Sequence, residues 1–445
     1  MKSILFTPVG STDPVRGCYD GACLHIIRWY HPDKIVVYYS KEMGDRELQD
    51  HRYTRGIHYL APNCLIEEIY SGIKAPHLYD EFITVFSEII HRIHKENSED
   101  RIIVNLSSGT PQMKTVLAIL STEYDWCLGV QVSSPEKRSN VANNPVSDNE
   151  DIDILLECNF DNERGAENRC SEPPLNVIRY YREKYQIMSM VTQYEYSGAL
   201  TLAKKSRLIS EETIRLLQHA QYRSGLMTDA AEKVLKKCDG EKLFPVSGIC
   251  RKLVEYLLIM QINENKGEYA DFMVKITPFL FEYFQEYVKK NIDFSLKRYI
   301  EKRKLMARKM NQDPLGKDLL YFLNNCCHGN YRDSDLSFLL LHEIVIFASQ
   351  QHKIINQNMQ DALQNNVLIQ HINDLRYLRN ETAHEITNIN REKFVEKVGL
   401  QPKQIMKSFW NLLEILYGTD IVNIRSTYDI INNKIEKSLE EHVEN

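Results

Sequence analysis

Apolar and polar positions follow two different periodicities along the chain, and the change between them falls near residue 160. Before that point, short apolar runs predict β-strands, and these runs are Ser3–Pro8, Lys34–Tyr39, Cys64–Tyr70, Arg101–Leu106, Trp126–Val132 and Ile152–Glu157. The segments between them have helical spacing and are Gly21–Tyr30, Gly44–Ile57, His77–His94 and Pro111–Thr122. Strands that alternate with helices predict a parallel, doubly wound α/β sheet of Rossmann-like topology.

Beyond residue 160 the pattern is helical almost throughout. The turn-rich stretch Asp161–Leu175, which contains Pro173 and Pro174, is the predicted start of the second part of the chain. We expect an α/β domain at residues 1–160, an all-α connecting segment at 161–240 and an all-α domain at 241–445. The expected helices include residues 293–310, 358–380 and 391–416.

The composition is that of an ordinary globular protein, with 445 residues of which 43% are hydrophobic and 26% charged. The net charge is −6, from 55 basic and 61 acidic residues, so a contact with nucleic acid must be local. One local exception is Lys289–Met310, which carries nine Lys or Arg against two acids. A solvated helix face is the preferred interpretation of this segment, and an RNA-binding track is the alternative.

Cysteine usage and hydropathy narrow the compartment. The ten cysteines form no C-x-x-C pair and no regular spacing, so we expect reduced thiols and no metal site. The chain has no charged-then-apolar leader at Met1 and no apolar run of about 18 residues. We therefore expect a cytoplasmic protein that does not engage a membrane.

Two loops with ligand-binding features follow the first and fourth predicted strands. With the common strand order 3-2-1-4-5, those strands are neighbours, and their carboxyl ends form the crevice in which ligands bind. In the first loop, Asp13 is expected to cap a helix that starts at Pro14, and in the second, Thr110 to cap one that starts at Pro111. The candidate ligand-binding residues are Gly10, Ser11, Thr12, Asp13, Ser107, Ser108, Gly109, Thr110, Gln112, Met113 and Lys114.

The second loop suits an anionic ligand. The amides of Gln112 and Met113 would face the crevice with the positive end of the helix behind them, as in sites for phosphate or nucleotide groups. Neither loop has the spacing of a P-loop or of a dinucleotide fingerprint. Simple helix capping is the alternative interpretation of each loop.

The stretch Leu375–Ile386 reads LRYLRNETAHEI and holds Arg379, Asn380 and His384. Arginine and histidine are the residues that RNA cleavage without a metal needs, because an imidazole moves protons near neutral pH and a guanidinium stabilises a phosphate as charge develops. On a straight helix, positions five apart lie about 140° from one another. The two side chains therefore converge only if the helix is distorted or if a second copy of the motif completes the site, and we favour a second copy in a dimer.

An α/β domain with Ser-Ser-Gly-Thr-Pro after its fourth strand, followed by helices with Arg379-Asn380-x-x-Ala383-His384, resembles one family over essentially the whole chain. These are the accessory ribonucleases of type III CRISPR systems, the Csm-six kind, built from a CARF sensor and a HEPN nuclease. The resemblance implies a CARF-like domain at 1–160, connecting helices at 161–240 and a HEPN-like domain at 241–445. It places Arg379, Asn380 and His384 in the catalytic positions and the two loops in the sensor.

The resemblance also implies partners and a mechanism. A homodimer would bind one cyclic oligoadenylate, made by the type III effector complex, across its two-fold axis, with cyclic hexa-adenylate favoured over cyclic tetra-adenylate. It would cleave single-stranded RNA without a metal, giving a 2′,3′-cyclic phosphate and a 5′-hydroxyl. The family also includes sensors that slowly cut their activator, for which segments Gly10–Asp13 and Thr110–Lys114 are the candidates.

Three alternatives stay open at this stage. One is an ordinary nucleotide-dependent enzyme with an appended helical domain, whose activity would survive deletion of the residues beyond 240. A nucleotide-responsive regulator without nuclease activity would share the sensor, but the C-terminal stretch Thr427–Asn445 is too acidic for a DNA-reading helix. A toxin-like HEPN ribonuclease would cleave RNA without any activator. Cleavage assays with and without cyclic oligoadenylates separate these alternatives.

Overall fold

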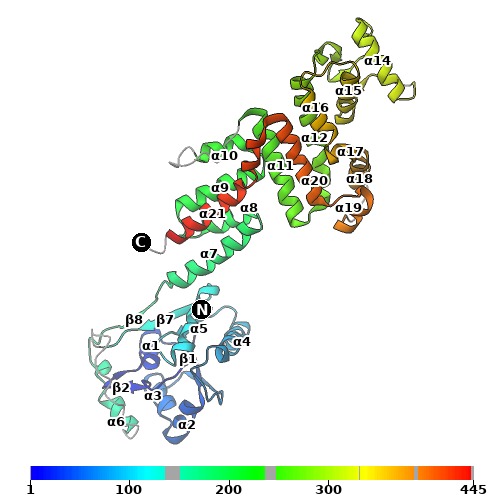
Figure 1. Cartoon of the computed structure of the whole chain (residues 1–445). Helices are drawn as coiled ribbons and strands as arrows, with labels where there is room; N and C mark the ends of the chain where they lie inside the picture. The colour runs from blue at the N-terminus through cyan, green and yellow to red at the C-terminus, as the bar shows by residue number, and fades with distance from the viewer. Residues whose placement is uncertain (1, 136–150, 236–246, 330, 385–388, 442–445) are drawn as a thin grey trace. The chain divides into compact units, whose positions relative to one another are not determined.

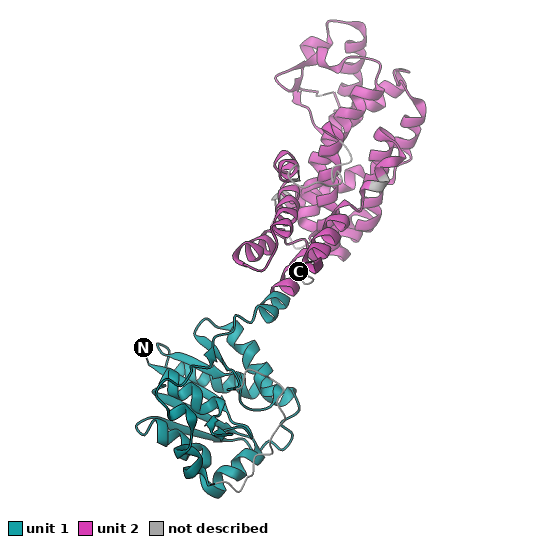
Figure 2. Ribbon diagram, turned by 90° about the vertical axis from the view of Figure 1, so that its left-hand side faces the viewer, with its two compact units in different colours: residues 1–182 teal, residues 183–445 magenta. Residues whose placement is uncertain are grey.

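The computed structural model describes residues 2–135, 151–235, 247–329, 331–384 and 389–441, which form two compact units. Figure 2 colours the first unit, Met1–Arg182, teal and the second, Glu183–Asn445, magenta. The first unit is α/β and the second is almost entirely helical, as the two periodicities predict (Figure 1). In the described part of the chain, no helix is long and apolar enough to cross a membrane.

The first unit is built on a six-stranded sheet with the order β5-β4-β1-β6-β7-β8. Its strands are β1 (Ser3–Pro8), β4 (Lys34–Tyr39), β5 (Leu65–Tyr70), β6 (Arg101–Asn105), β7 (Cys127–Val132) and β8 (Cys170–Ser171). The first five strands are parallel and follow the order 3-2-1-4-5, so this prediction is confirmed. β1 and β6 are neighbours at the centre, which is where the switch point of such a sheet lies.

Helices cover both faces of the sheet. Leu5 pairs in register with Ile35 and Ile103, and these side chains pack beneath α1 (Ala22–Tyr30), α2 (Lys41–Asp50) and α3 (Arg52–Leu60). Phe6 and its neighbours point to the other face, against α4 (Asp80–Glu96) and α5 (Pro111–Glu123). Because successive side chains of a strand alternate between faces, two-sided burial explains the continuous apolar runs that predicted these strands.

The prediction of a last strand at Ile152–Glu157 is wrong. Ile152–Glu157 forms helix α6, capped by Asp151, whose side chain accepts the N–H of Asp153. Ile152 and Leu156 are four residues apart and share the buried face, so the apolar spacing is helical rather than continuous. The sheet ends instead with β8, which runs antiparallel to β7. Residues 161–171 therefore belong to the α/β unit. The sequence had led us to expect them in the connecting segment, which was predicted to start at residue 161.

The rest of the chain is mostly helical. Its helices are α7 (Asn176–Thr192), α8 (Tyr196–Lys205), α9 (Glu211–Ser224), α10 (Thr228–Leu235), α11 (Gly248–Lys266), α12 (Tyr269–Asn291), α14 (Pro314–Cys326), α15 (Phe338–Gln350), α16 (Gln357–Gln364), α17 (Val367–Gln370), α18 (Ile372–His384), α19 (Arg391–Val398), α20 (Pro402–Tyr417) and α21 (Thr427–Glu440). The final helix, α21, packs back against α9. Tyr196 donates a hydrogen bond to Asn432 at 2.8 Å, so the end of the chain is tied to the connecting helices.

The helix expected at residues 293–310 is also wrong. This stretch is a 3₁₀ turn at Leu296–Tyr299, a hairpin of β9 (Ile300–Glu301) and β10 (Lys304–Leu305), and the short helix α13 (Ala307–Met310). β10 pairs with the distant strand β11 (Ser334–Asp335). Long-range pairing of this kind leaves no periodic signal in the local sequence.

A buried ion pair joins the connecting helices to the second core. Arg223 of α9 contacts Glu255 of α11 through two hydrogen bonds of 2.9 and 2.7 Å, and also donates to Thr427 at 3.1 Å. The two charged side chains are 0% and 3% exposed. Removing one member would leave the other charge buried without its partner, which is the costly way to break such a pair.

We predict that Glu255→Ala lowers the free energy of unfolding by about 3–5 kcal/mol, because Arg223 keeps its buried charge. The matched control is Glu282→Ala, which removes a carboxylate that pairs with Lys252, a side chain that is 60% exposed. That loss should be below about 1 kcal/mol. Chemical denaturation followed by circular dichroism measures both, and equal losses would contradict a special role for the buried pair.

Candidate functional site

The two predicted loops meet at the carboxyl ends of β1 and β6. Gly10 and Gly109 approach so closely that a Cβ on Gly10 would lie 3.1 Å from the backbone nitrogen of Gly109. Gly109 has φ +84°, and a Cβ there would lie 2.8 Å from the sulfur of Met113 and 3.2 Å from Pro8. Glycine is therefore needed at both positions, at Gly109 for its backbone conformation as well as for space. The prediction that the loops share one crevice agrees with this geometry.

Asn105, the last residue of β6, organises the second loop from below. Its amide nitrogen donates to the hydroxyls of Thr7 and Ser108, each at 2.9 Å, and its carbonyl accepts the backbone N–H groups of Ser107 and Ser108. Asn105 is fully buried. Sequence reasoning missed this residue, although a polar side chain that ends an apolar strand (RIIVN) is a usable signal.

Asp13 holds the first loop from inside the domain. One carboxylate oxygen accepts the N–H of Gly10 and the other accepts the N–H of Cys23 in the first turn of α1, each at 3.0 Å. Burial raises the pKa of Asp13, while the N–H groups of Cys23 and Gly10, the Ser108 hydroxyl and the charge of Lys114 oppose that shift. Asp13 therefore ties the first loop to the first turn of α1, whose N-cap is Gly21, and it does not cap a helix at Pro14 as predicted.

The segment after Asp13 is a hairpin, β2 (Val15–Arg16) paired with β3 (Tyr19–Asp20), and α1 begins at Ala22. The prediction of a helix at Pro14 is therefore wrong. It failed because the sequence Asp-Pro also occurs in turns, and the true partner of the Asp13 carboxylate is ten residues away.

The second loop ends as predicted, in a capped helix. Thr110 is the N-cap of α5 and Pro111 its first residue, and the Thr110 hydroxyl accepts the N–H of Met113 at 3.4 Å. The same hydroxyl donates to the carbonyl of Pro76 at 2.7 Å. The N–H of Met113 is therefore used within the helix and does not face the crevice, and this detail of the prediction is wrong.

Burial divides the candidate ligand-binding residues into two groups. Asp13, Ser108 and Met113 are buried and shape the loops. The residues with at least partly exposed surface are Gly10, Ser11, Thr12, Ser107, Gly109, Thr110, Gln112 and Lys114. The second group has side-chain or backbone surface open to solvent at the carboxyl ends of β1 and β6.

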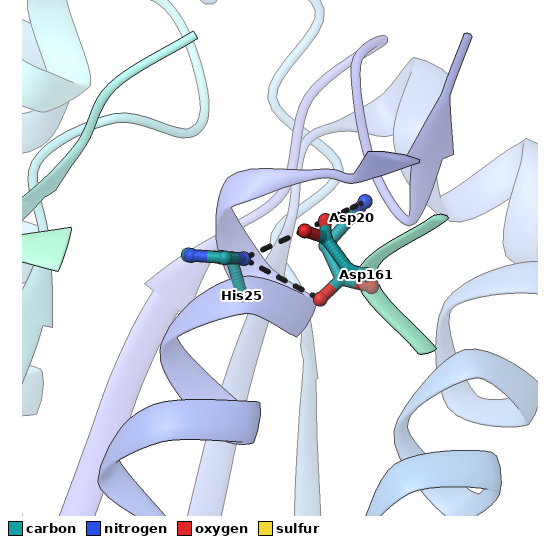
Figure 3. Close-up of side chains that lie close together, drawn as sticks. All are labelled: Asp20, His25 and Asp161. Carbon is teal, nitrogen blue, oxygen red and sulfur yellow. Dashed lines mark hydrogen bonds and ion pairs between the residues drawn. The ribbon is translucent and has the colours of Figure 1, made fainter. Parts of the chain in front are cut away.

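A buried cluster near these loops has the composition of a metal site. Asp20, His25 and Asp161 bring ligand atoms within 4.8 Å of one another, and Figure 3 shows the imidazole of His25 facing both carboxylates. Two arginines already serve these acids, because Arg28 donates to Asp20 and Arg169 to Asp161, each at 2.6 Å. With both carboxylates paired to guanidinium groups, we interpret the cluster as an ion-pair network that ties β8 and its approach to α1.

The nuclease-like motif lies on α18 (Figure 1). Arg379, Asn380 and the backbone of His384 belong to one continuous helix, whose buried face includes Leu375 and Leu378. The side chain of His384 lies outside the described residues. From Ile372 to His384 the described backbone is one uninterrupted α-helix, and its pitch puts positions 379 and 384 on different faces.

A hydrogen bond redirects Arg379. Its guanidinium donates to the Asn380 side-chain oxygen at 3.1 Å, and its buried Nε–H has no acceptor among the described residues. Asn380 and His384 are four residues apart, or about 40° around the helix, so they share a face. The guanidinium therefore lies against the Asn380 side chain, and helix pitch assigns position 384 to the same face as Asn380.

Other side chains of α18 contact groups outside the motif. Glu381 pairs with Lys393 of α19 at 2.7 Å, and this hydrogen bond lowers the pKa of Glu381. Its carboxylate is thus directed to α19 and away from the motif. Tyr377, on the same stripe as Asn380, is 65% exposed, with Arg376 stacked over its ring at 5.4 Å.

Three family models match successive parts of the chain. They are the Cas_Csm6 CARF domain at residues 65–170, the Csm6 6H domain at 173–224 and the Cas_Csm6 HEPN domain at 243–436. A Rossmann-like sensor joined through helices to a HEPN domain defines the class of CRISPR-associated CARF–HEPN ribonucleases. The chain belongs to the Csm6 family of that class, as the resemblance predicted, and is a CRISPR-associated endoribonuclease.

Relatives align along the full length. The chain is 26% identical to the CRISPR system endoribonuclease Csm6 of Mycobacterium tuberculosis, over 98% of this chain and 99% of that protein. It is 23% identical to the Csm6 endoribonuclease of Enterococcus italicus, over 88% and 89%. The solved structure of Enterococcus italicus Csm6 bound to cyclic hexa-2′-fluoro-hexa-dAMP has the same fold, with a TM-score of 0.66 at 21% identity over 98% of this chain and 100% of that one.

We predict that Gly109→Ala weakens ligand binding in the crevice and costs about 1–3 kcal/mol of stability, because it adds strain at φ +84° and a clash with Met113 and Pro8. The matched control is Gly72→Ala, at φ +67° with no atom within 4 Å of the added Cβ. Calorimetric titration with cyclic oligoadenylates and thermal melting measure both variants. Undiminished binding by Gly109→Ala would show that the contact between the loops is dispensable.

Proposed function

We propose that the chain is a cyclic-oligoadenylate-activated endoribonuclease that works as a homodimer and cleaves single-stranded RNA in type III CRISPR defence. Its CARF-like sensor spans residue 1 to about residue 171, the connecting helices follow, and the HEPN-like nuclease holds α18. The observation that carries the nuclease assignment is the Arg379–Asn380 hydrogen bond, which turns a guanidinium towards the His384 face. A second copy of α18 supplies the remaining part of the site.

The reaction follows from the chemistry of these groups. A ribose 2′-hydroxyl attacks the adjacent phosphorus, the bond to the 5′-oxygen breaks, and the products are a 2′,3′-cyclic phosphate and a 5′-hydroxyl. His384 moves the proton: its imidazole accepts the proton of the 2′-hydroxyl, and the imidazolium so formed donates a proton to the leaving 5′-oxygen. Arg379 stabilises the charge that develops on the phosphate, and Asn380 orients Arg379. The proposed chemistry needs no metal.

The activator is proposed to bind at the crevice between β1 and β6. The exposed loop residues around Gly10 and Gly109, with Lys114 nearby, offer backbone N–H groups and positive charge to phosphates or adenine rings. A two-fold dimer would present both loops twice to a symmetric ring. The Enterococcus italicus relative binds a cyclic hexa-nucleotide analogue, which supports cyclic hexa-adenylate over cyclic tetra-adenylate here. Slow cleavage of the activator by the Gly10–Asp13 and Thr110–Lys114 loops is part of this proposal.

In this proposal the sensor controls the nuclease by changing the populations of two states of the dimer. The dimer has one state in which the two α18 helices form the nuclease site and one in which they do not. A ligand that binds the first state more tightly increases its population. The connecting helices transmit this preference, and the buried Arg223–Glu255 pair makes α9 and α11 move together.

RNA cleavage with no activator, with cyclic tetra-adenylate and with cyclic hexa-adenylate tests this function. We predict strong activation by cyclic hexa-adenylate, because the sensor must bias the dimer before the composite site forms. Cleavage that neither ring changes would favour the toxin-like alternative. Ligand binding without any cleavage would favour the regulator without nuclease activity.

In the activated assay, His384→Ala and Arg379→Ala should each lower kcat by at least about 10²–10³-fold, the usual loss when a transition-state donor is removed. Arg379→Lys should not restore the rate, because an ammonium group lacks the planar fork that reaches both Asn380 and phosphate. Calorimetric binding of the activator should be unchanged in all three variants. Full activity of His384→Ala would refute the assignment.

A further inference from the structure

A basic hairpin in the second unit adopts an unfavourable turn. β9 and β10 are joined by two residues, Lys302 at φ +45° and Arg303 at φ +69°. Two-residue turns with both residues in the left-handed region favour Asn-Gly, because a Cβ in that region costs energy. The chain therefore places two long cations where stability alone favours Asn-Gly, and strain of this kind concentrates at functional positions.

The cations of this hairpin are free to meet an external anion. The exposed side chains are those of Lys297, Arg298, Lys302, Arg303 and Lys304. Within the described chain, no carboxylate lies within ion-pair distance of any of these five, whereas the nearby Arg308 and Lys309 are both paired with Glu301. In a protein with net charge −6, such a group makes a local positive field that favours a polyanion.

A cavity opens beside the hairpin. It has a volume of about 590 Å³ and lies between α12, the hairpin and the start of α15. Its apolar walls are Pro278, Phe281, Ile300, Leu336 and Phe338. Arg303 and Asp335 also line it, so the cation of the turn and a carboxylate reach the same space. The volume falls within the range of about 300–1,000 Å³ of small-molecule sites, and apolar walls with a few polar groups are their usual lining.

We propose that the hairpin and this cavity form an accessory subsite for single-stranded RNA, an inference that rests on the proposed ribonuclease function. Phosphates lie on Lys302, Arg303 and Lys304, and one unpaired base enters the cavity against Phe281. Cations that follow a backbone, next to an apolar surface that accepts a base, are the usual features of single-strand binding.

Asp335 gives the subsite a base preference. Its carboxylate only accepts hydrogen bonds when ionised, so it favours the amino groups of adenine, cytosine or guanine over uracil, which offers a single ring N–H. An acidic peptide, the other class of polyanion that the cations could attract, has no base whose amino group could donate to this carboxylate.

The test uses full-length protein and fluorescent 2′-O-methyl RNA, which has no free 2′-hydroxyl and resists cleavage. The variant Lys302→Asn/Arg303→Gly removes two cations and gives the turn its favoured sequence. The control Lys289→Gln/Lys317→Gln removes two exposed cations from the same unit. We expect the turn variant, and not the control, to reduce the slope of log K against log salt by about 1.4, from about 0.7 per phosphate contact on single strands.

Thermal melting separates this role from a structural one. The turn variant should melt at the same temperature as the wild type or higher, because Asn-Gly relieves the strain of the turn. Binding equal to the wild type, an equal loss in the control, or equal displacement of RNA by poly-glutamate of the same charge would overturn the proposal.

The preference for one base over another is measured with the same RNA-binding assay. Wild-type protein should bind oligo-A and oligo-C more tightly than oligo-U or an abasic strand, and Asp335→Asn should narrow that difference. Equal binding of all four strands would overturn the role of the cavity. Because binding is measured without cleavage or activator, a failure of the proposed ribonuclease function would appear separately, in the cleavage assay.

Discussion

The pitch of α18 limits how its side chains can form a nuclease site. Arg379 and His384 are five residues apart on α18, which is continuous from Ile372 to His384, and five residues correspond to about 140° of rotation. One helix cannot direct both groups at one phosphate unaided. The hydrogen bond from Arg379 to Asn380 removes part of this difference by bringing the guanidinium to the neighbouring face. In the proposed dimer, a second α18 would remove the rest.

The sensor depends on a comparable close approach. The contact between Gly10 and Gly109 lets two loops from adjacent strands form one surface, and buried polar groups fix that surface from below. Asn105 satisfies the second loop, and Asp13 satisfies the first loop and the start of α1 at once. Loops held in this way by buried polar groups would need little reorganisation to bind the proposed activator.

Much of the sensor could be predicted from sequence because burial on both faces leaves strong apolar runs. The order of its five parallel strands and the cap at Thr110 followed from such local signals. The errors arose where a distant partner decides the structure. Asp13 accepts the N–H of Cys23, ten residues away in α1, and β10 pairs with β11 across about thirty residues. The segment Ile152–Glu157 is too short for its period to be assigned.

The nuclease motif shows the same limit. Arg379, Asn380 and His384 could be identified from their chemistry and spacing, but the direction of the guanidinium could not, since it depends on which neighbour accepts its hydrogen bond. The role of Glu381 likewise depends on Lys393 of another helix. The candidate residues could be predicted from the sequence, but tertiary contacts decide how their side chains are oriented.

The central claim is that residues of two chains share one nuclease site, and subunit complementation tests it most directly. Arg379→Ala and His384→Ala chains, each inactive alone, are co-expressed with different tags, and the mixed dimer is isolated and assayed with activator. The account predicts that the mixed dimer regains RNA cleavage, because one chain supplies the guanidinium and the other the imidazole. A mixed dimer as inactive as either parent, with activator binding intact, would contradict it.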